Sequence, residues 1–195
     1  MEGITEDGGG RRWSRWRIAA WSAAALILLL PLVAMQFTDE VNWDVADFAL
    51  AGILLVGVGI SYELAARKTG DTAYKFAVGL ALAAAFILIW VNGAVGIIGS
   101  ENNDANLLFF GVLAVAAVGS LIARFRAGGM AIALYATALA QVILAAFAIT
   151  MSLGTSGPTW PRDILMLTAV FSAIWLASGW LFGRAADTER RLFFD

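Results

Sequence analysis

The chain contains no cysteine and no histidine, and only 14% of its 195 residues are charged. Without cysteine there is no disulfide, no thiolate nucleophile and no Cys-ligated zinc or iron–sulfur site. Without histidine, imidazole bases and the usual protein ligands of zinc, copper, haem and di-iron centres are missing as well. These absences exclude or disfavour most familiar catalytic and redox sites.

Apolar residues make up 61% of the chain and give it a mean hydropathy of +0.79. Soluble domains are about 45–50% apolar and about 25% charged, so this composition predicts an integral membrane protein. Its long apolar stretches are sufficient to cross ~30 Å of hydrocarbon as helices. We predict an all-α bundle of six transmembrane helices, a single membrane domain over residues 1–195. The predicted spans are residues 18–37, 48–64, 76–99, 105–123, 130–153 and 164–182, between a basic and aromatic tail at 1–17 and a charged tail at 183–195.

The basic residues predict the orientation of the spans. With six spans, every Lys and Arg except Arg162 falls on the side of the two termini. Positive charge accumulates in cytoplasmic loops, so both termini are predicted to be cytoplasmic. The expected partners are the lipid bilayer and other membrane subunits or a second copy. No nucleic acid is expected, because a membrane anchor directly follows the basic tail.

An internal repeat is a further prediction. A shift of 59 positions superimposes the hairpin of spans two and three on that of spans four and five. The matched pairs include Gly52 with Gly111, Ser61 with Ser120, Arg67 with Arg126 and Gly70 with Gly129. Chance matches between unrelated hairpins are the alternative in so apolar a chain. Repeats are common in transporters, but they also occur in membrane proteins that transport nothing.

The middles of the predicted spans hold no Asp, Glu, Lys or Arg, the residues that mark ion and proton pathways. The polar candidates that remain are Asn92 and Gln141, and Gln141 shares a helix face with Thr137. We expect Gln141 to hydrogen-bond a neighbouring helix, and a substrate contact is the alternative. A second helical stripe, for which packing is the expected role, consists of Thr168, Ser172, Trp175 and Gly179.

Gly93, Gly96 and Gly99 recur at every third position near the end of the third span. In a helix they form a bare strip on which another helix can pack, which is the role we expect. The alternative is that the backbone unwinds there and exposes carbonyl groups to a ligand. No phosphate-binding loop is predicted, since the strand–turn–helix context is missing.

Two acidic, Asn-bearing stretches lie on the predicted outer side, at residues 38–47 and 101–106. Carboxylates and Asn carbonyls are typical ligands of Ca²⁺ and Mg²⁺, although the spacing matches no EF-hand loop. The predicted ligands of such a divalent cation are Asp39, Glu40, Asp44, Glu101 and Asp104. Helix capping, by Asp44 or Asp47 for the second span, with the other charges kept outside by topology, is the explanation we expect. No cofactor is therefore predicted, and a Ca²⁺ or Mg²⁺ site is the alternative.

Four stretches carry a resemblance to known sequences: Asp39–Phe48, Tyr62–Lys68, Val91–Asn106 and Leu121–Arg126. They resemble a group of small predicted multi-pass bacterial inner-membrane proteins with no assigned activity. The resemblance covers about residues 36–150. It implies a bacterial inner-membrane location and transfers no substrate, cofactor or catalytic residue.

Three functions stay open at this point. The first is a non-catalytic accessory, assembly or scaffold component, indicated by short loops and small-residue helix faces. The second is a small transporter or channel with an acidic outer mouth, indicated by the repeat and Gln141. The third is a metal-assisted membrane enzyme, which would depend on Asp and Glu for acid–base chemistry. We expect the first and no enzyme activity.

Overall fold

The computed structural model describes residues 8–38, 41–100, 102–155, 157 and 159–194. Over these residues it is all-helical, and six helical segments are long and apolar enough to cross a membrane, which confirms the predicted fold class. The helices are α1 (Gly8–Ala34), α2 (Val45–Lys68), α3 (Thr72–Ala94), α4 (Leu108–Ile122), α5 (Ala127–Thr150) and α6 (Arg162–Phe194), with a short 3₁₀ turn, η1 (Asp104–Leu107), before α4.

Both segments expected as tails are partly helical. The first helix, α1, begins at Gly8, and α6 continues past residue 182 to Phe194. Contacts one turn apart support the extension of α6. Asp187 pairs with Arg190 at 4.0 Å, and the Arg184 guanidinium lies 5.0 Å from the centre of the Trp180 ring. The change to polar residues therefore marks the end of the apolar stretch and not the end of the helix.

By its contacts the chain divides into two compact units, residues 1–60 and 61–195, and each is described by itself. In the first unit, Trp21 of α1 packs on Gly59 of α2, where an added Cβ would lie 2.7 Å from the indole ring. A capping box fixes the start of α2. Asp44 accepts a hydrogen bond from the Asp47 N–H at 3.0 Å, and Asp47 accepts one from the Asp44 N–H at 2.9 Å. The capping predicted for these two residues is confirmed, while the single-domain organisation stays a prediction.

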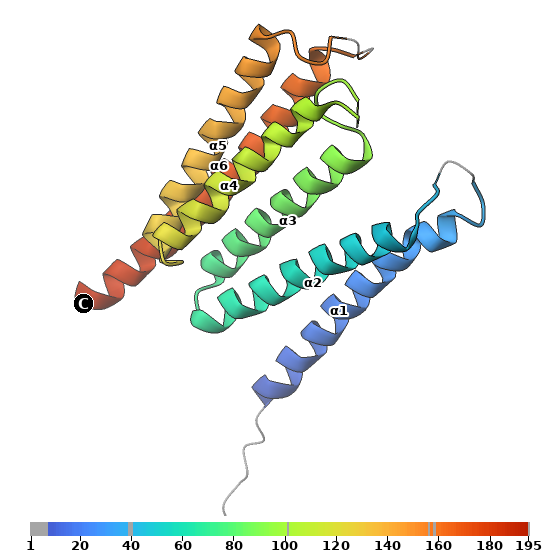
Figure 1. Cartoon of the computed structure of the whole chain (residues 1–195). Coiled ribbons are helices and arrows are strands. Elements are labelled where there is room, and N and C mark those ends of the chain that lie inside the picture. The colour runs from blue at the N-terminus through green and yellow to red at the C-terminus, as the bar shows by residue number, and fades with distance from the viewer. Residues whose placement is uncertain (1–7, 39–40, 101, 156, 158, 195) are drawn as a thin grey trace, which may run out of the picture. The chain divides into compact units, whose positions relative to one another are not determined.

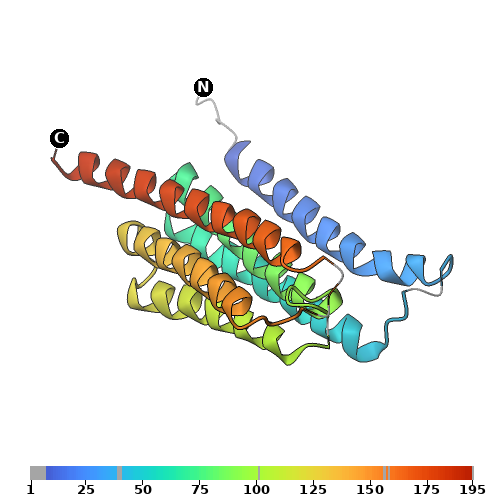
Figure 2. The ribbon, with the colours of Figure 1, turned by 90° about the horizontal axis from the view of Figure 1, so that it is seen from above.

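The second unit is a bundle of α3, α4, α5 and α6 with the last turns of α2. Figures 1 and 2 show α6 running beside α5 and α5 beside α4, and α3 packs along α6. In contrast, α3 and α4 touch at few positions. Small residues allow the close approaches, since Gly119 faces Ala133 and Gly179 faces Tyr135. The largest fully buried side chains include Trp175, Phe109, Phe171 and Phe182.

One buried side chain organises the loop between α3 and α4. The Asn106 carbonyl oxygen accepts hydrogen bonds from the backbone N–H groups of Ile97 and Ile98, both at 2.8 Å. Its amide nitrogen donates to the Ser100 carbonyl at 2.6 Å. This asparagine therefore satisfies buried backbone donors that no helix supplies with a partner. The sequence had indicated an outer polar cluster here, without this structural role.

The expected glycine strip is not formed, because α3 ends at Ala94. Gly96 and Gly99 lie in the following loop with φ values of 74° and 80°, a backbone conformation that favours glycine. Gly99 packs against the backbone of Gly154 in the α5–α6 loop, where a Cβ added to Gly154 would lie 2.7 Å from the Gly99 nitrogen. We call this end of the bundle the Gly99 end. Here the glycines hold two loops together and seat no helix.

Candidate functional site

The bundle contains a cleft between α3 and α4, because these helices pack on α6 and α5 and hardly on each other. Its walls carry small side chains, with Ala81 and Ala85 from α3 and Ala116 and Ala117 from α4. The last turns of α2 add further lining. The cavity volume is about 540 Å³, within the roughly 300–1,000 Å³ typical of small-molecule sites. It is mainly apolar, which suits a ligand from the membrane interior.

The floor of the cleft is formed by Met130 and Leu134 of α5 and Trp175 of α6. The Trp175 side chain is 1% exposed, and its indole Nε1 has no hydrogen-bond partner among the described residues. An indole N–H is a donor only, and a buried donor without an acceptor costs about 1–3 kcal/mol. The Trp175 indole N–H is therefore a buried, unused donor beside the floor of the cleft.

The cleft has a polar rim at the turn between α4 and α5, which we call the Phe125 end. The Tyr74 hydroxyl donates to the Phe125 carbonyl at 2.7 Å and ties the start of α3 to this turn. Asp71 caps α3 by accepting from the Tyr74 N–H at 2.8 Å. Lys68, the last residue of α2, has its Nζ 5.1 Å from the centre of the Phe125 ring. An ammonium group is thus placed beside apolar walls.

Polar side chains also occupy the interior of the bundle. Gln141 is 0% exposed, and neither atom of its side-chain amide has a partner among the described residues, so the expected interhelical hydrogen bond is not made. Gly179 faces Tyr135 across the antiparallel α5–α6 pair. Gln141 lies about two turns after Tyr135 in α5, and Ser172 lies about two turns before Gly179 in α6. Because the helices are antiparallel, Gln141 and Ser172 are at the same height in the bundle. The hydroxyls of Ser172 and Thr168 are also buried without a partner among the described residues.

The other polar residues predicted for the spans bond within their own helices. The Thr137 hydroxyl donates to the Ala133 carbonyl at 2.8 Å, and the Asn92 amide nitrogen donates to the Leu88 carbonyl at 2.8 Å. Both side chains are buried, and the Asn92 Oδ1 has no partner among the described residues. All members of the second stripe, Thr168, Ser172, Trp175 and Gly179, are buried, and their packing role stays a prediction.

The structure leaves the predicted divalent-cation site untested. Asp44 serves as the helix cap described above, and Asp104 is an exposed residue in the first turn of η1. Asp39, Glu40 and Glu101 lie outside the described residues. Within the part of the chain that is described, no three His, Cys, Asp or Glu side chains come together as metal ligands. The site therefore stays a prediction.

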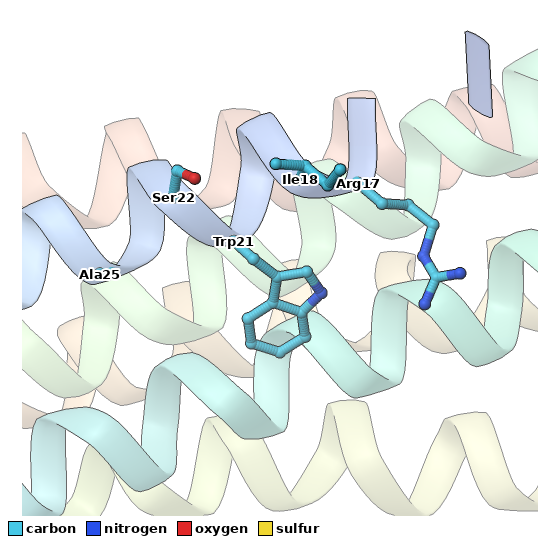
Figure 3. A pocket seen from close by; sticks show the side chains of 5 residues that line it. All are labelled: Arg17, Ile18, Trp21, Ser22 and Ala25. Carbon is cyan, nitrogen blue, oxygen red and sulfur yellow. The ribbon is translucent and has the colours of Figure 1, made fainter. Parts of the chain in front are cut away.

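A second hollow, of about 480 Å³, lies along α1 in the first unit. Figure 3 labels the residues that line it, Arg17, Ile18, Trp21, Ser22 and Ala25. The side chains of Arg17 and Trp21 extend to one side of the helix, and Ser22 points to the other. Because all its lining residues belong to one helix, this hollow encloses a ligand less well than the α3–α4 cleft.

The sequence did not reveal the cleft. Lys68 lies outside the predicted span 48–64, and Trp175 was expected to serve packing. The small residues Ala81 and Ala85 recur at helical spacing, but that spacing is common in a chain with so much alanine. Lys68 of α2 and Trp175 of α6 line the same cleft only because of the tertiary arrangement of the helices.

The described residues give a multi-pass membrane protein with a cleft in its helical bundle. Compared with protein-family models, with curated proteins and with solved structures, the chain gives no match. A function for this protein therefore has to be argued from the chemistry of the cleft itself.

Proposed function

We propose that this protein is a non-catalytic accessory, assembly or scaffold component of a membrane, and that it holds a lipid-soluble molecule in the cleft between α3 and α4. The observation that carries the proposal is the cleft itself, with a volume of about 540 Å³ and mostly apolar walls. A molecule dissolved in the bilayer enters such a site without crossing water. Its expected partners are the bilayer lipids and other membrane subunits or a second copy.

Purification in mild detergent followed by native mass spectrometry tests this proposal. A bound small hydrophobic molecule or lipid should survive on the wild-type protein, and Ala85→Phe should displace it by filling the cleft. Ala83→Phe is the matched control, because Ala83 lies two positions away on the exposed face of α3. Equal retention by the two variants would contradict binding in the cleft.

The proposed location is the inner membrane of a bacterium, with both termini in the cytoplasm. The support is the resemblance described above and the basic residues gathered on the side of the termini. Because the chain has no cysteine, single Cys substitutions can be labelled without background. Positions 42, 103 and 157 should react with an impermeant maleimide in spheroplasts, whereas 70, 128 and 188 should not. Labelling of position 128 from outside would overturn the orientation.

A small transporter or channel is the second candidate, and the interior polar groups favour it. Gln141, Thr168 and Ser172 are buried with side-chain atoms that have no partner among the described residues, as expected where water or a polar solute passes. Ser172→Cys tests this directly, because a small charged thiol reagent should modify it in an open pathway. Failure to modify Ser172→Cys in a folded protein would argue against translocation.

A further inference from the structure

We propose that the cleft selects a lipid with an anionic headgroup, which lies against Lys68, while the indole N–H of Trp175 donates to a carbonyl oxygen farther along the same molecule. This inference rests on the proposed function, since it specifies the molecule that the cleft holds. It assigns a chemical role to each end of the cleft.

Lys68, the cation at the rim of the cleft, differs from its neighbour Arg67 in its contacts. Of the two basic residues in the last turn of α2, Arg67 is paired with Glu63 at 3.3 Å and is not among the lining residues. Lys68 lines the cleft, is exposed, and has its ammonium over the Phe125 ring. A ring face leaves the ammonium able to donate hydrogen bonds to an anion. Basic residues between membrane helices are a recognised feature of sites for anionic headgroups.

Two of the three Ser and Tyr hydroxyls that line the cleft are already used. The Tyr74 hydroxyl donates to the Phe125 carbonyl, and the Ser120 hydroxyl donates to the Ala116 carbonyl, both at 2.7 Å. Trp175 differs, because its buried Nε1 has no acceptor among the described residues. A carbonyl oxygen of a bound lipid satisfies a donor of this kind, whereas a hydrocarbon chain does not.

The two contact points are separated along the cleft. The Tyr74 and Phe182 rings meet at the Phe125 end with centroids 5.1 Å apart. Trp175 precedes Phe182 by two helical turns, which places it about 10 Å deeper along the bundle at ~1.5 Å per residue. A small anion at Lys68 does not reach that depth. A lipid whose headgroup is at the rim and whose acyl linkage and chain run past Ala81 and Ala85 reaches both.

The test uses the full-length protein in nanodiscs and two pairs of phospholipids, with bound lipid counted by native mass spectrometry. One pair differs only in the headgroup, anionic or zwitterionic, and the other only in the chain linkage, ester or ether. The wild-type protein should retain the anionic lipid about fivefold better, since one cation near a membrane surface contributes about 1 kcal/mol. It should also retain ester lipid over ether lipid, because only the ester has the carbonyl.

Each variant should remove one preference and keep the other. Lys68→Gln should abolish the headgroup preference, and its neighbour Arg67→Gln, the matched control, should not. Trp175→Phe keeps an aromatic ring but has no N–H, so it should lose the ester preference and keep the headgroup preference. Inorganic phosphate at millimolar concentration should not displace the lipid, which distinguishes a lipid headgroup from a free anion.

The outcomes separate this inference from the proposed function. If lipid is displaced by Ala85→Phe but the wild-type protein shows no headgroup preference, the cleft is occupied and the anion-selective site is wrong. If a headgroup preference exists but survives Lys68→Gln, the assignment of Lys68 is overturned. If Ala85→Phe and Ala83→Phe retain equal lipid, only the general lipid layer is bound and both proposals fail.

Discussion

The apolar window of α1 has a mean hydropathy of 2.0 and is 0% buried within the structure, whereas the window of α5 has a mean hydropathy of 2.2 and is 39% buried. The window of α2 resembles that of α1, with a mean hydropathy of 1.9 and 6% burial. Equal hydropathy therefore accompanies very different packing. In a membrane, hydropathy reports the surrounding solvent, while packing depends on small residues and specific contacts between helices.

The contacts of the two units differ in kind. In the bundle, helices are joined by hydrogen bonds and backbone approaches, such as the Ser178 hydroxyl donating to the Ala77 carbonyl at 2.8 Å and Gly129 lying against Ala123. In the first unit, the close approach to Gly59 is made by the far end of the Trp21 side chain. A side-chain end can shift, whereas backbone cannot. Substitutions in the bundle should therefore cost more than substitutions in the first unit.

The largest effect is expected at the Gly99 end of the bundle, for Asn106→Leu. The backbone N–H groups of Ile97 and Ile98 would lose their acceptor inside the protein. At about 1–3 kcal/mol for each buried unsatisfied donor, unfolding free energy should fall by roughly 2–6 kcal/mol. Thermal or denaturant unfolding in detergent measures this. Asn103→Ala, which removes one side-chain bond to the Ala105 N–H, should cost about 1 kcal/mol. A loss no larger for Asn106→Leu would contradict the structural role of Asn106.

Gly154→Ala should be the next most damaging change. It places a Cβ 2.7 Å from the Gly99 nitrogen at a φ of +78°, and both the clash and the left-handed backbone oppose it. We expect a loss of about 2–4 kcal/mol, again measured by unfolding. Gly111→Ala is the control, because no atom lies within 4 Å of an added Cβ there. That change should stabilise α4 by up to about 1 kcal/mol.

Gln141→Leu tests whether an unpartnered polar side chain inside the bundle contributes to stability. The substitution removes two buried amide atoms that have no partner among the described residues. We expect unfolding free energy to stay equal or to rise, by no more than about 2 kcal/mol. Any measurable activity should be unchanged. A marked loss of stability would show that the amide contacts water or a solute, and a loss of activity in a folded protein would favour the transporter.

The smallest effects are expected in the first unit, where Gly57→Ala and Gly59→Ala form a matched pair on α2. No atom lies within 4 Å of a Cβ at Gly57, whereas one at Gly59 would meet the Trp21 ring at 2.7 Å. Gly57→Ala should stabilise the helix by up to about 1 kcal/mol, and Gly59→Ala should change stability by less than that. In a Trp21→Ala background the two substitutions should become equivalent, as unfolding measurements on the double variants would show. A persistent difference would mean that the Trp21–Gly59 contact does not hold α1 and α2 together.

Some local contacts follow from sequence spacing alone, because they form within one or two helical turns. Asp44 and Asp47 have the spacing of a capping box, and Glu63 and Arg67 the spacing of a helical ion pair, and each pair forms as that spacing indicates. The prediction of a glycine strip on a helix at Gly93–Gly99 was wrong, because three-residue spacing is equally compatible with a helix face and with a loop. In this chain the helix ends at Ala94 and the loop packs on Gly154.

Composition and the order of apolar and polar stretches were sufficient to establish a helical protein with six segments able to cross a membrane. The reason is that backbone polar groups in hydrocarbon must be satisfied within the segment, so a long apolar stretch has few alternatives to a helix. The partner of each helix is not encoded in this way, because lipid and helix surfaces are equally apolar. Tertiary packing alone put α3 on α6 and α4 on α5, opened the cleft between them, and brought Lys68 and Trp175 to its lining.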